Sequence, residues 1–248
     1  MTPDLVLLHG FTQTRQSWRR TVQALGGRYR ALVPDLPGHG QAALRTASFD
    51  AVTAYVRALA PSRFTLAGYS MGGRIALNAA FALEPERLIL LGATPGLADP
   101  KERATRKAAD DALADRVEAI GIEAFAAEWA AQPLFAGQPE RVRAAANADR
   151  LRNTSHGLAA ALRGLGTGVM EPLWERLPDL RTPVTLIVGE RDEKFRAIAE
   201  RMRERLPHAD LVVVPGTGHA AHLESPELVA QAIYQSGLPS SSDSAYSP

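Results

Sequence analysis

The chain contains the stretch Phe64-Thr-Leu-Ala-Gly-Tyr-Ser-Met-Gly-Gly-Arg74, which places a G-x-S-x-G pattern directly after a short apolar run. The apolar run predicts a buried strand, the small residues predict a tight turn, and the alanine-rich segment that follows predicts a helix over 71–83. In this context the serine is held exposed on a sharp turn. It also lies at a helix N-terminus, where backbone donors and the helix dipole stabilise developing negative charge. The stretch therefore predicts that Ser70 carries a reactive hydroxyl.

Two further motifs supply the partners that a reactive serine needs. One late apolar run is followed by Val188-Gly-Glu-Arg-Asp192, and the next is followed by Gly216-Thr-Gly-His219. A histidine can take the serine proton, and a carboxylate on its far ring nitrogen fixes the tautomer and stabilises the imidazolium. The order Ser, Asp, His along the chain is the order found in α/β-hydrolases. We therefore predict a catalytic triad of Ser70, His219 and Asp192.

Two backbone amides are predicted to bind the negative charge that develops during the reaction. In this fold one amide belongs to the residue after the reactive serine, here Met71. The second comes from the loop after an early strand, which in this chain contains His9-Gly-Phe11. We assign that amide to Phe11. Its side chain can at the same time be a packed aromatic, because the oxyanion hole uses only the backbone N–H.

Short apolar runs alternate with segments of helical periodicity along much of the chain. The runs predict strands at 5–8, 31–33, 64–67, 88–91, 183–188 and 211–214. The periodic segments predict helices at 17–25, 48–60, 71–83, 195–206 and 226–236. Strands that alternate with helices form a parallel sheet that is covered on both faces. The predicted class is α/β, with an α/β-hydrolase fold built on a mostly parallel sheet flanked by helices.

The middle of the chain departs from this alternation. Residues 99–178 are rich in Ala, Arg and Glu, show helical periodicity and contain no convincing strand. An all-helical insertion within an α/β protein is typical of a lid. We therefore predict a hydrolase core of residues 1–94 and 179–238, with a helical lid at 95–178. Residues 239–248 are rich in serine and are predicted to form a disordered tail.

Composition excludes several classes of function. The chain has 248 residues, a formal net charge of +1 and no cysteine, so we expect one sizeable domain without disulfides or thiolate metal sites. The small net charge gives no reason to expect nucleic-acid binding, and no apolar stretch suits a signal peptide or a bilayer span. No His, Asp and Glu cluster has metal-ligand spacing. We expect a cytoplasmic monomer or weak homo-oligomer that uses no metal and no cofactor.

Four motifs and the lid resemble one branch of the α/β-hydrolases. The motifs are Leu8-His-Gly-Phe-Thr12, Gly68-Tyr-Ser-Met-Gly-Gly-Arg74, Gly189-Glu-Arg-Asp-Glu-Lys-Phe195 and Gly218-His-Ala-Ala-His222, and the lid segments are Glu102–Arg106, Trp129–Phe135 and Arg152–Leu162. Together they look like the 2-succinyl-6-hydroxy-2,4-cyclohexadiene-1-carboxylate synthase family of menaquinone biosynthesis, over nearly the whole chain except the tail. Gln13 is a departure, because the family pattern has a small residue there.

The resemblance implies a lyase reaction without a cofactor. Pyruvate is eliminated from 2-succinyl-5-enolpyruvyl-6-hydroxy-3-cyclohexene-1-carboxylate, a small tricarboxylate, and the Ser-His-Asp triad acts as the base. The substrate-binding residues that the resemblance implies are Arg74, Arg106, Arg152, Tyr69 and Trp129. The residues alone add His222, which closely follows His219, as a second choice for a substrate contact.

Residue types alone leave several alternatives open. Bidentate arginine suits carboxylates, but Arg74, one helical turn after Ser70, can equally form a structural ion pair. Arg106 and Arg152 can belong to a solvated face, and Trp129 can anchor the core of the lid. The same triad also serves carboxylesterases and carbon–carbon bond hydrolases that act through an acyl-enzyme, and a third alternative is a ligand receptor without catalysis.

Overall fold

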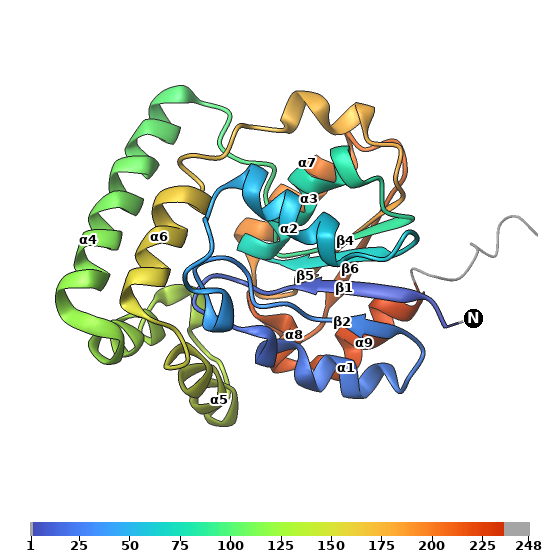
Figure 1. Cartoon of the computed structure of the whole chain (residues 1–248). Coiled ribbons are helices and arrows are strands. Elements are labelled where there is room, and N and C mark those ends of the chain that lie inside the picture. The colour runs from blue at the N-terminus through green and yellow to red at the C-terminus, as the bar shows by residue number, and fades with distance from the viewer. Residues whose placement is uncertain (1, 236–248) are drawn as a thin grey trace, which may run out of the picture.

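The computed structural model describes residues 2–235 and is built on one six-stranded sheet. The strand order is β2-β1-β3-β4-β5-β6, and every neighbouring pair is parallel. The strands are β1 (Asp4–Leu8), β2 (Arg30–Leu32), β3 (Thr65–Tyr69), β4 (Arg87–Leu91), β5 (Val184–Gly189) and β6 (Ala209–Val214). Each lies where the sequence predicts a strand (Figure 1). The predicted tail at 239–248 lies outside the described residues.

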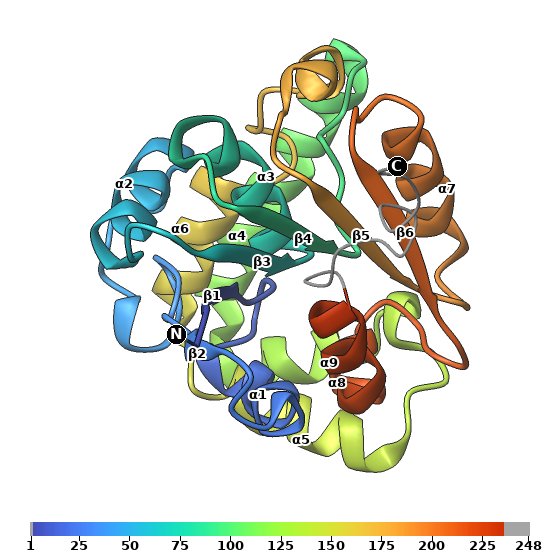
Figure 2. The same ribbon diagram turned by 90° about the vertical axis from the view of Figure 1, so that its right-hand side faces the viewer.

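Helices cover both faces of this sheet (Figures 1 and 2). One face is covered by α1 (Arg19–Leu25), α8 (Ala221–Glu224) and α9 (Pro226–Gln235), and the other by α2 (Phe49–Leu59), α3 (Met71–Leu83) and α7 (Glu193–Arg203). In β1, Leu5 and Leu7 are buried on the first face, whereas Val6 and Leu8 are buried on the second. Successive side chains of a strand point to opposite faces, so burial on both faces explains why the strands read as unbroken apolar runs.

The segment between β4 and β5 is helical and lies beside the carboxyl ends of the strands (Figure 1). It forms α4 (Pro100–Ala130), α5 (Glu140–Arg150) and α6 (Ser155–Leu165). A backbone break at Gly121, with φ 78° and ψ 172°, divides α4. Phe125 of α4 and Leu158 of α6 belong to a separate apolar cluster that joins these helices. The predicted helices are thus present, and their action as a lid stays a prediction.

Short 3-10 helices connect the main elements: η1 (Arg15–Trp18), η2 (Gly40–Ala42), η3 (Pro133–Phe135) and η4 (Trp174–Asp179). The predicted helix at 17–25 is therefore a 3-10 turn that continues into α1. Thr14 caps this turn, because its side-chain oxygen accepts a hydrogen bond from the Gln16 N–H at 3.3 Å. The four-residue helix α8 was not predicted, because it is too short to show periodicity.

Three buried histidines are expected to make the fold sensitive to acid. Burial lowers the pKa of His9 to about 4 and the pKa values of His39 and His222 to about 3. In the unfolded chain each imidazole takes up a proton near pH 6.5, whereas the folded chain keeps it neutral. Stability is therefore full above about pH 6.5 and falls by up to about 4 kcal/mol per pH unit between pH 6 and pH 4. Urea unfolding across this range measures the slope.

His222→Phe should reduce this slope by about a third, because one of the three proton-uptake sites is removed. His208→Gln is the matched control, since His208 is exposed. An acid slope that is the same in His222→Phe and in the unmodified chain would contradict the assignment of His222 as a buried neutral imidazole.

Candidate active site

Ser70 occupies a strained turn between β3 and α3. Its backbone has φ 50° and ψ −108°, a region that non-glycine residues rarely adopt. A Cβ atom at Gly72 would lie 2.3 Å from the Leu8 carbonyl oxygen, and one at Gly68 would lie 2.2 Å from the Gly72 carbonyl oxygen. Only glycine fits at these two positions, so the sequence pattern is required by the close packing of the turn. The Ser70 N–H donates to the Leu91 carbonyl at 2.9 Å and fixes the turn on the sheet.

The predicted triad residues meet at the carboxyl ends of three strands. The Ser70 hydroxyl lies 3.2 Å from Nε2 of His219, and Nδ1 of His219 lies 2.6 Å from Oδ2 of Asp192. His219 and Asp192 are buried, whereas Ser70 is partly exposed. With Asp192 ionised, His219 donates from Nδ1 and its Nε2 accepts the Ser70 proton. The arrangement can therefore make the Ser70 oxygen basic or nucleophilic.

Neighbouring groups hold the His219 ring in this position. The Phe195 ring lies 4.4 Å from the His219 ring and the Tyr69 ring lies 5.2 Å from it, centroid to centroid. The loop itself is fixed by Glu224, whose carboxylate accepts the Gly218 N–H at 2.9 Å. Packing and hydrogen bonding together restrict the imidazole to an orientation that reaches both triad partners.

The two predicted oxyanion amides are free. Within residues 2–235, no acceptor lies in hydrogen-bonding range of the N–H of Phe11 or of Met71. Both residues line the cleft that contains Ser70. Unused backbone donors beside a reactive hydroxyl are suited to binding an oxyanion.

Gln13, the departure from the family pattern, closes the loop that carries Phe11. Its side-chain oxygen accepts the Gly10 N–H at 3.2 Å, and its own N–H donates to the Gly10 carbonyl at 3.2 Å. The larger side chain therefore replaces a small residue without blocking the Phe11 amide, because it turns back onto Gly10.

A cleft beside Ser70 and His219 has two lobes. The larger lobe holds about 200 Å³ and is lined by Phe11, Met71, Arg74, Arg106, Trp129 and Lys194 among others. The smaller lobe holds about 40 Å³, and its distinct lining residues include Tyr69, Phe135, Gln138 and Arg150. Ser70 and His219 line both lobes, so a ligand that fills the cleft extends to either side of the reactive hydroxyl.

Arg74 is a buried cation in the wall of the larger lobe. It is 8 % exposed, and its guanidinium donates to the Leu165 carbonyl at 2.7 Å. Within the described residues it forms no ion pair, which removes the alternative of a structural salt bridge. Burial, and secondarily the charge of Arg106, lower the pKa of Arg74 to about 10, against an opposing contribution from the Asp110 carboxylate in the same lobe. A buried cation that forms no ion pair is suited to binding a carboxylate.

Arg106 lines the same lobe from the helical segment. Its Nε donates to Oδ1 of Asp110 at 2.8 Å, and its side chain is 47 % exposed. Asp110 is buried and also accepts the Gly168 N–H at 3.3 Å. Asp110 therefore holds Arg106 at the cleft. The Arg106 guanidinium is paired through Nε, which leaves its other N–H donors for a ligand.

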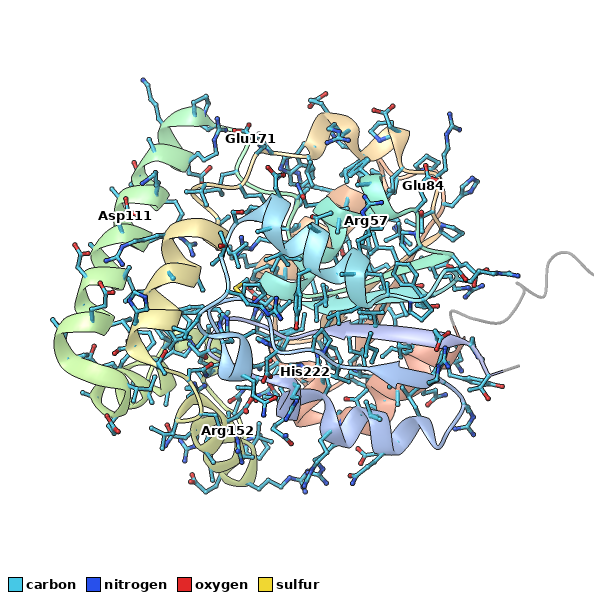
Figure 3. The ribbon with its side chains drawn as sticks, in the orientation of Figure 1. Arg57, Glu84, Asp111, Arg152, Glu171 and His222 are labelled. Carbon is cyan, nitrogen blue, oxygen red and sulfur yellow. The ribbon has the colours of Figure 1, made fainter. Side chains whose placement is uncertain are left out.

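Two predicted contacts lie outside the cleft. Arg152 has a side chain that is 59 % exposed, 3.8 Å from Asp149, and it borders a separate hollow beside α5 (Figure 3). His222 is fully buried, with its ring 4.7 Å from that of Trp18 and 4.2 Å from that of Tyr69. Neither side chain reaches either lobe. Arg152 follows the end of α5 and turns outward. The Tyr69 ring, which lines the smaller lobe, lies against the buried His222 ring.

Arg150, which was not predicted, lies in the cleft that Arg152 does not reach. It is 5 % exposed, lines the smaller lobe, and lies 5.4 Å from the Phe135 ring. Its Nε has no hydrogen-bond partner within the described residues, and burial lowers its pKa. The buried positions Val142, Ala146 and Arg150 recur every four residues along α5, so helical periodicity was the signal that could have identified Arg150.

The two predicted aromatic residues both contact the cleft. Tyr69 is buried and lines the smaller lobe, where burial raises its pKa. Trp129 lines both lobes and packs edge-on against Phe11 at 5.1 Å. The indole N–H of Trp129 is buried without an acceptor among the described residues, so Trp129 contributes to the aromatic cluster of the helical segment and also offers a donor to a ligand. Lys194, which sequence reasoning did not single out, lines the larger lobe.

No other type of centre is visible in the part of the chain that the structure describes. Residues 2–235 contain no group of three His, Asp or Glu side chains placed to hold a metal ion. Across the same residues, every helix is too short or too polar to cross a bilayer.

Comparison with known proteins connects this site to a family. Residues 5–232 match the model of the alpha/beta hydrolase family. The 2-succinyl-6-hydroxy-2,4-cyclohexadiene-1-carboxylate synthase of Klebsiella pneumoniae is 36% identical over 94% of this chain and 93% of its own length. The structure of MenH from S. aureus matches with a TM-score of 0.91 and 32% identity over 95% of this chain and 93% of that chain.

A more distant match is an esterase. The thermophilic esterase from Thermogutta terrifontis has a TM-score of 0.78 and 28% identity, over 94% of this chain and 88% of that chain. The α/β-hydrolase fold predicted from the sequence is confirmed by these matches. The chain therefore belongs to the alpha/beta hydrolase family and, within it, to the 2-succinyl-6-hydroxy-2,4-cyclohexadiene-1-carboxylate synthases.

Proposed function

We propose that the chain is a carbon–oxygen lyase of menaquinone biosynthesis. It eliminates pyruvate from 2-succinyl-5-enolpyruvyl-6-hydroxy-3-cyclohexene-1-carboxylate and forms 2-succinyl-6-hydroxy-2,4-cyclohexadiene-1-carboxylate. Membership of the synthase family supports this reaction. The observation that carries it is Arg74, a buried cation that forms no ion pair among the described residues, one helical turn from Ser70. A cation in this position suits a carboxylate substrate and not a neutral ester.

The triad acts as a base in this proposal. His219 takes the Ser70 proton, and the Ser70 oxygen removes the acidic hydrogen beside the succinyl ketone. The electron pair moves through the ring alkene, the bond between the ring carbon and the enolpyruvyl oxygen breaks, and enolpyruvate leaves with that bonding pair. The proton held by His219 is returned as enolpyruvate becomes pyruvate, which restores the triad. Asp192 supports the imidazolium, and the amides of Phe11 and Met71 stabilise the enolate oxygen. No bond to water is made or broken, so the helical segment acts as a lid that excludes water.

Three arginines line the cleft, beside Lys194, and the substrate carries three carboxylates. Arg74 and Arg106 lie in the larger lobe, and Arg150 lies in the smaller one. Anchors on either side of Ser70 would hold the acidic carbon and the leaving group in line, which converts orientation into rate. Arg150 replaces Arg152 in this assignment.

Arg150→Ala is expected to lower kcat/KM roughly 10- to 150-fold, because a buried charge-assisted contact to the substrate is lost. This factor corresponds to a loss of about 1.5–3 kcal/mol in transition-state stabilisation. Arg152→Ala is the matched control from the same turn. It should change kcat/KM by less than about 0.5 kcal/mol, because Arg152 is exposed. Steady-state kinetics of pyruvate release measures both values. A larger loss of kcat/KM in Arg152→Ala than in Arg150→Ala would favour Arg152 as the substrate contact, as first predicted from the sequence.

The test of the function itself follows the reaction with the ring substrate. Pyruvate release and diene absorbance should rise together. Turnover in oxygen-18 water should leave no heavy oxygen in the diene beyond slow exchange at its ketone. Acid-quenched enzyme should show no mass adduct and no stoichiometric burst of pyruvate. A trapped acyl group on Ser70, or solvent oxygen built into the product, would exclude the lyase mechanism.

The competing function is a carboxylesterase or carbon–carbon bond hydrolase. The hydrogen-bonded arrangement of Ser70, His219 and Asp192 and the likeness to the Thermogutta esterase favour this alternative. Weak activity on activated aryl esters is compatible with both functions, so relative kcat/KM values decide between them. A neutral ester turned over far better than the tricarboxylate would favour the hydrolase. The cytoplasmic location and the monomeric or weakly associating state remain predictions from the sequence.

A further inference from the structure

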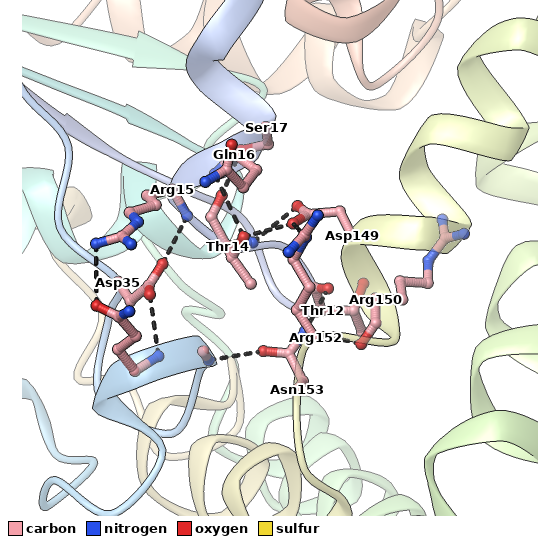
Figure 4. A network of polar contacts seen from close by, with 12 residues as sticks. Thr12, Thr14, Arg15, Gln16, Ser17, Asp35, Asp149, Arg150, Arg152 and Asn153 are labelled. Atoms are coloured by element: carbon pink, nitrogen blue, oxygen red, sulfur yellow. Dashed lines mark hydrogen bonds and ion pairs between the residues drawn. The ribbon is translucent and has the colours of Figure 1, made fainter.

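The loop that carries the Phe11 amide is attached to the helical segment by buried side chains (Figure 4). Asp149, near the end of α5, accepts the Thr14 N–H at 2.9 Å and also accepts the Thr14 hydroxyl. Asn153, in the turn before α6, donates to the Thr12 carbonyl at 2.9 Å. The end of the oxyanion loop is therefore held by residues that lie far away in the sequence.

Among residues 2–235, Asp149 forms a single ion pair, and that pair is long. Asp149 is 6 % exposed, and the nearest arginine nitrogen, Nε of Arg152, is 3.8 Å away. Both carboxylate oxygens are instead bound by Thr14. The side-chain oxygen of Asn153 accepts the Gly40 N–H at 3.0 Å, so this residue joins three separate segments. Burying a carboxylate against uncharged donors is costly, which favours a geometric role for Asp149 over a purely stabilising one.

Thr12, whose carbonyl is bound by Asn153, directly follows Phe11, the residue with the free N–H. Thr12 has φ 66°, a left-handed conformation that costs a non-glycine residue free energy. Its N–H donates to Nε2 of His39 at 3.3 Å while its carbonyl accepts from Asn153, so both sides of the strained residue are fixed. The peptide plane before Phe11 is set by the Gly10 carbonyl, which accepts the Gln13 N–H at 3.2 Å and the Nδ1–H of His9 at 2.9 Å. A shift of Thr12 or Thr14 would therefore rotate the plane that carries the Phe11 N–H.

We propose that Asp149 and Asn153 are positioning residues that orient the Phe11 amide, so that the oxyanion hole is complete only while the α5–α6 turn is docked on the loop. This inference rests on the proposed role of that amide in binding an oxyanion. Arg150 lies between these two residues and faces the smaller lobe. A carboxylate bound by Arg150 therefore stabilises the same docked turn, which links substrate binding to the assembly of the hole.

The test compares Asn153→Ala and Asp149→Asn with Arg163→Ala. Arg163 joins α6 to α4 through Asp115 and Glu118 and makes no contact with the loop, so it controls for general weakening of the helical segment. We expect kcat for pyruvate release to fall between about tenfold and a hundredfold in the first two variants, with KM changed less than about threefold. Arg163→Ala should keep kcat within about twofold.

A second readout uses acylation of Ser70 by an activated aryl acetate. The acyl transfer needs the same two amides, so the acylation rate should fall by a similar factor in Asn153→Ala and Asp149→Asn. Because this measurement does not use the ring substrate, it tests the clamp even if the enzyme releases no pyruvate. Failure of the proposed function is seen in the unmodified enzyme, whereas failure of this inference is seen only in the comparison of variants.

Unchanged kcat and acylation rates in both variants would overturn the inference. A rise in KM at constant kcat would also overturn it, because Asp149 and Asn153 would then act in binding. Asn153→Asp serves if the alanine variant does not fold, since it keeps the acceptor for Gly40 and loses the donor to Thr12. It should reproduce the loss in kcat at an unchanged melting temperature, and wild-type kcat in Asn153→Asp would count against the clamp.

Discussion

Ser70→Ala is expected to lower kcat for pyruvate release by about a thousandfold or more, because the oxygen that accepts the substrate proton is removed. His219→Ala should cause a comparable loss, since nothing else within hydrogen-bonding distance of the Ser70 hydroxyl can take its proton among the described residues. Asp192→Asn should also reduce kcat, by favouring the wrong tautomer of His219. Steady-state assays with the ring substrate give all three values.

The combined variant Ser70→Ala with His219→Ala is the matched control, because residues that act as a unit are not additive. Its kcat should be within a few fold of the kcat of the slower single variant. Near-wild-type turnover in Ser70→Ala would refute the triad as the base. Substrate binding measured by calorimetry should be little changed in that variant, since the arginines remain.

Arg74→Ala is expected to cost about 2–5 kcal/mol in kcat/KM, the range for unpairing a desolvated charge. The substrate carboxylate would enter the larger lobe without its buried cation, which has no substitute on α3. Arg74→Lys should recover only part of the loss, because an ammonium group cannot reproduce the two parallel hydrogen bonds of a guanidinium. Kinetics on the ring substrate and on a neutral aryl ester measure the effect.

The neutral ester separates this role from a general defect. Loss of Arg74 should affect the tricarboxylate strongly and the ester weakly, because the ester carries no anion for the guanidinium. Arg181→Ala, at an exposed position outside the cleft, controls for the loss of a positive charge. Equal losses on both substrates would show that Arg74 maintains the fold of α3 and does not recognise the carboxylate.

The sheet and the triad could be predicted from sequence because local chemistry specifies both. A strand buried on two faces must be apolar throughout, and β1, β3, β4 and β5 are read directly from that requirement. The turn at Ser70 admits only glycine at positions 68 and 72. Parallel strands bring their carboxyl ends to one edge, so the order of three loops is enough to place the triad.

The remaining part of the site depends on which way long side chains point, and the sequence does not specify this for the helical segment. Arg150 and Arg152 are two positions apart, yet one is buried in the cleft and the other is exposed. The end of α5 lies between them, and a helix end cannot be located to within two residues from sequence. The burial of His222 outside the cleft could not be predicted, because α8, the helix that buries its ring beside Tyr69, is too short to show periodicity.

The common helix of Ser70 and Arg74 has a consequence for any movement of the helical segment. Ser70 caps α3 and Arg74 lies one turn into it, so their backbones are separated by about 6 Å of helical rise, wherever α4, α5 and α6 lie. The Arg74 guanidinium, however, donates to the Leu165 carbonyl of α6. Arg106 and Arg150, in contrast, belong to those helices and move with them. If the helical segment acts as a lid, its movement therefore leaves the backbone of Arg74 at a constant distance from Ser70, whereas the backbones of Arg106 and Arg150 shift and the Arg74 guanidinium loses its contact with Leu165.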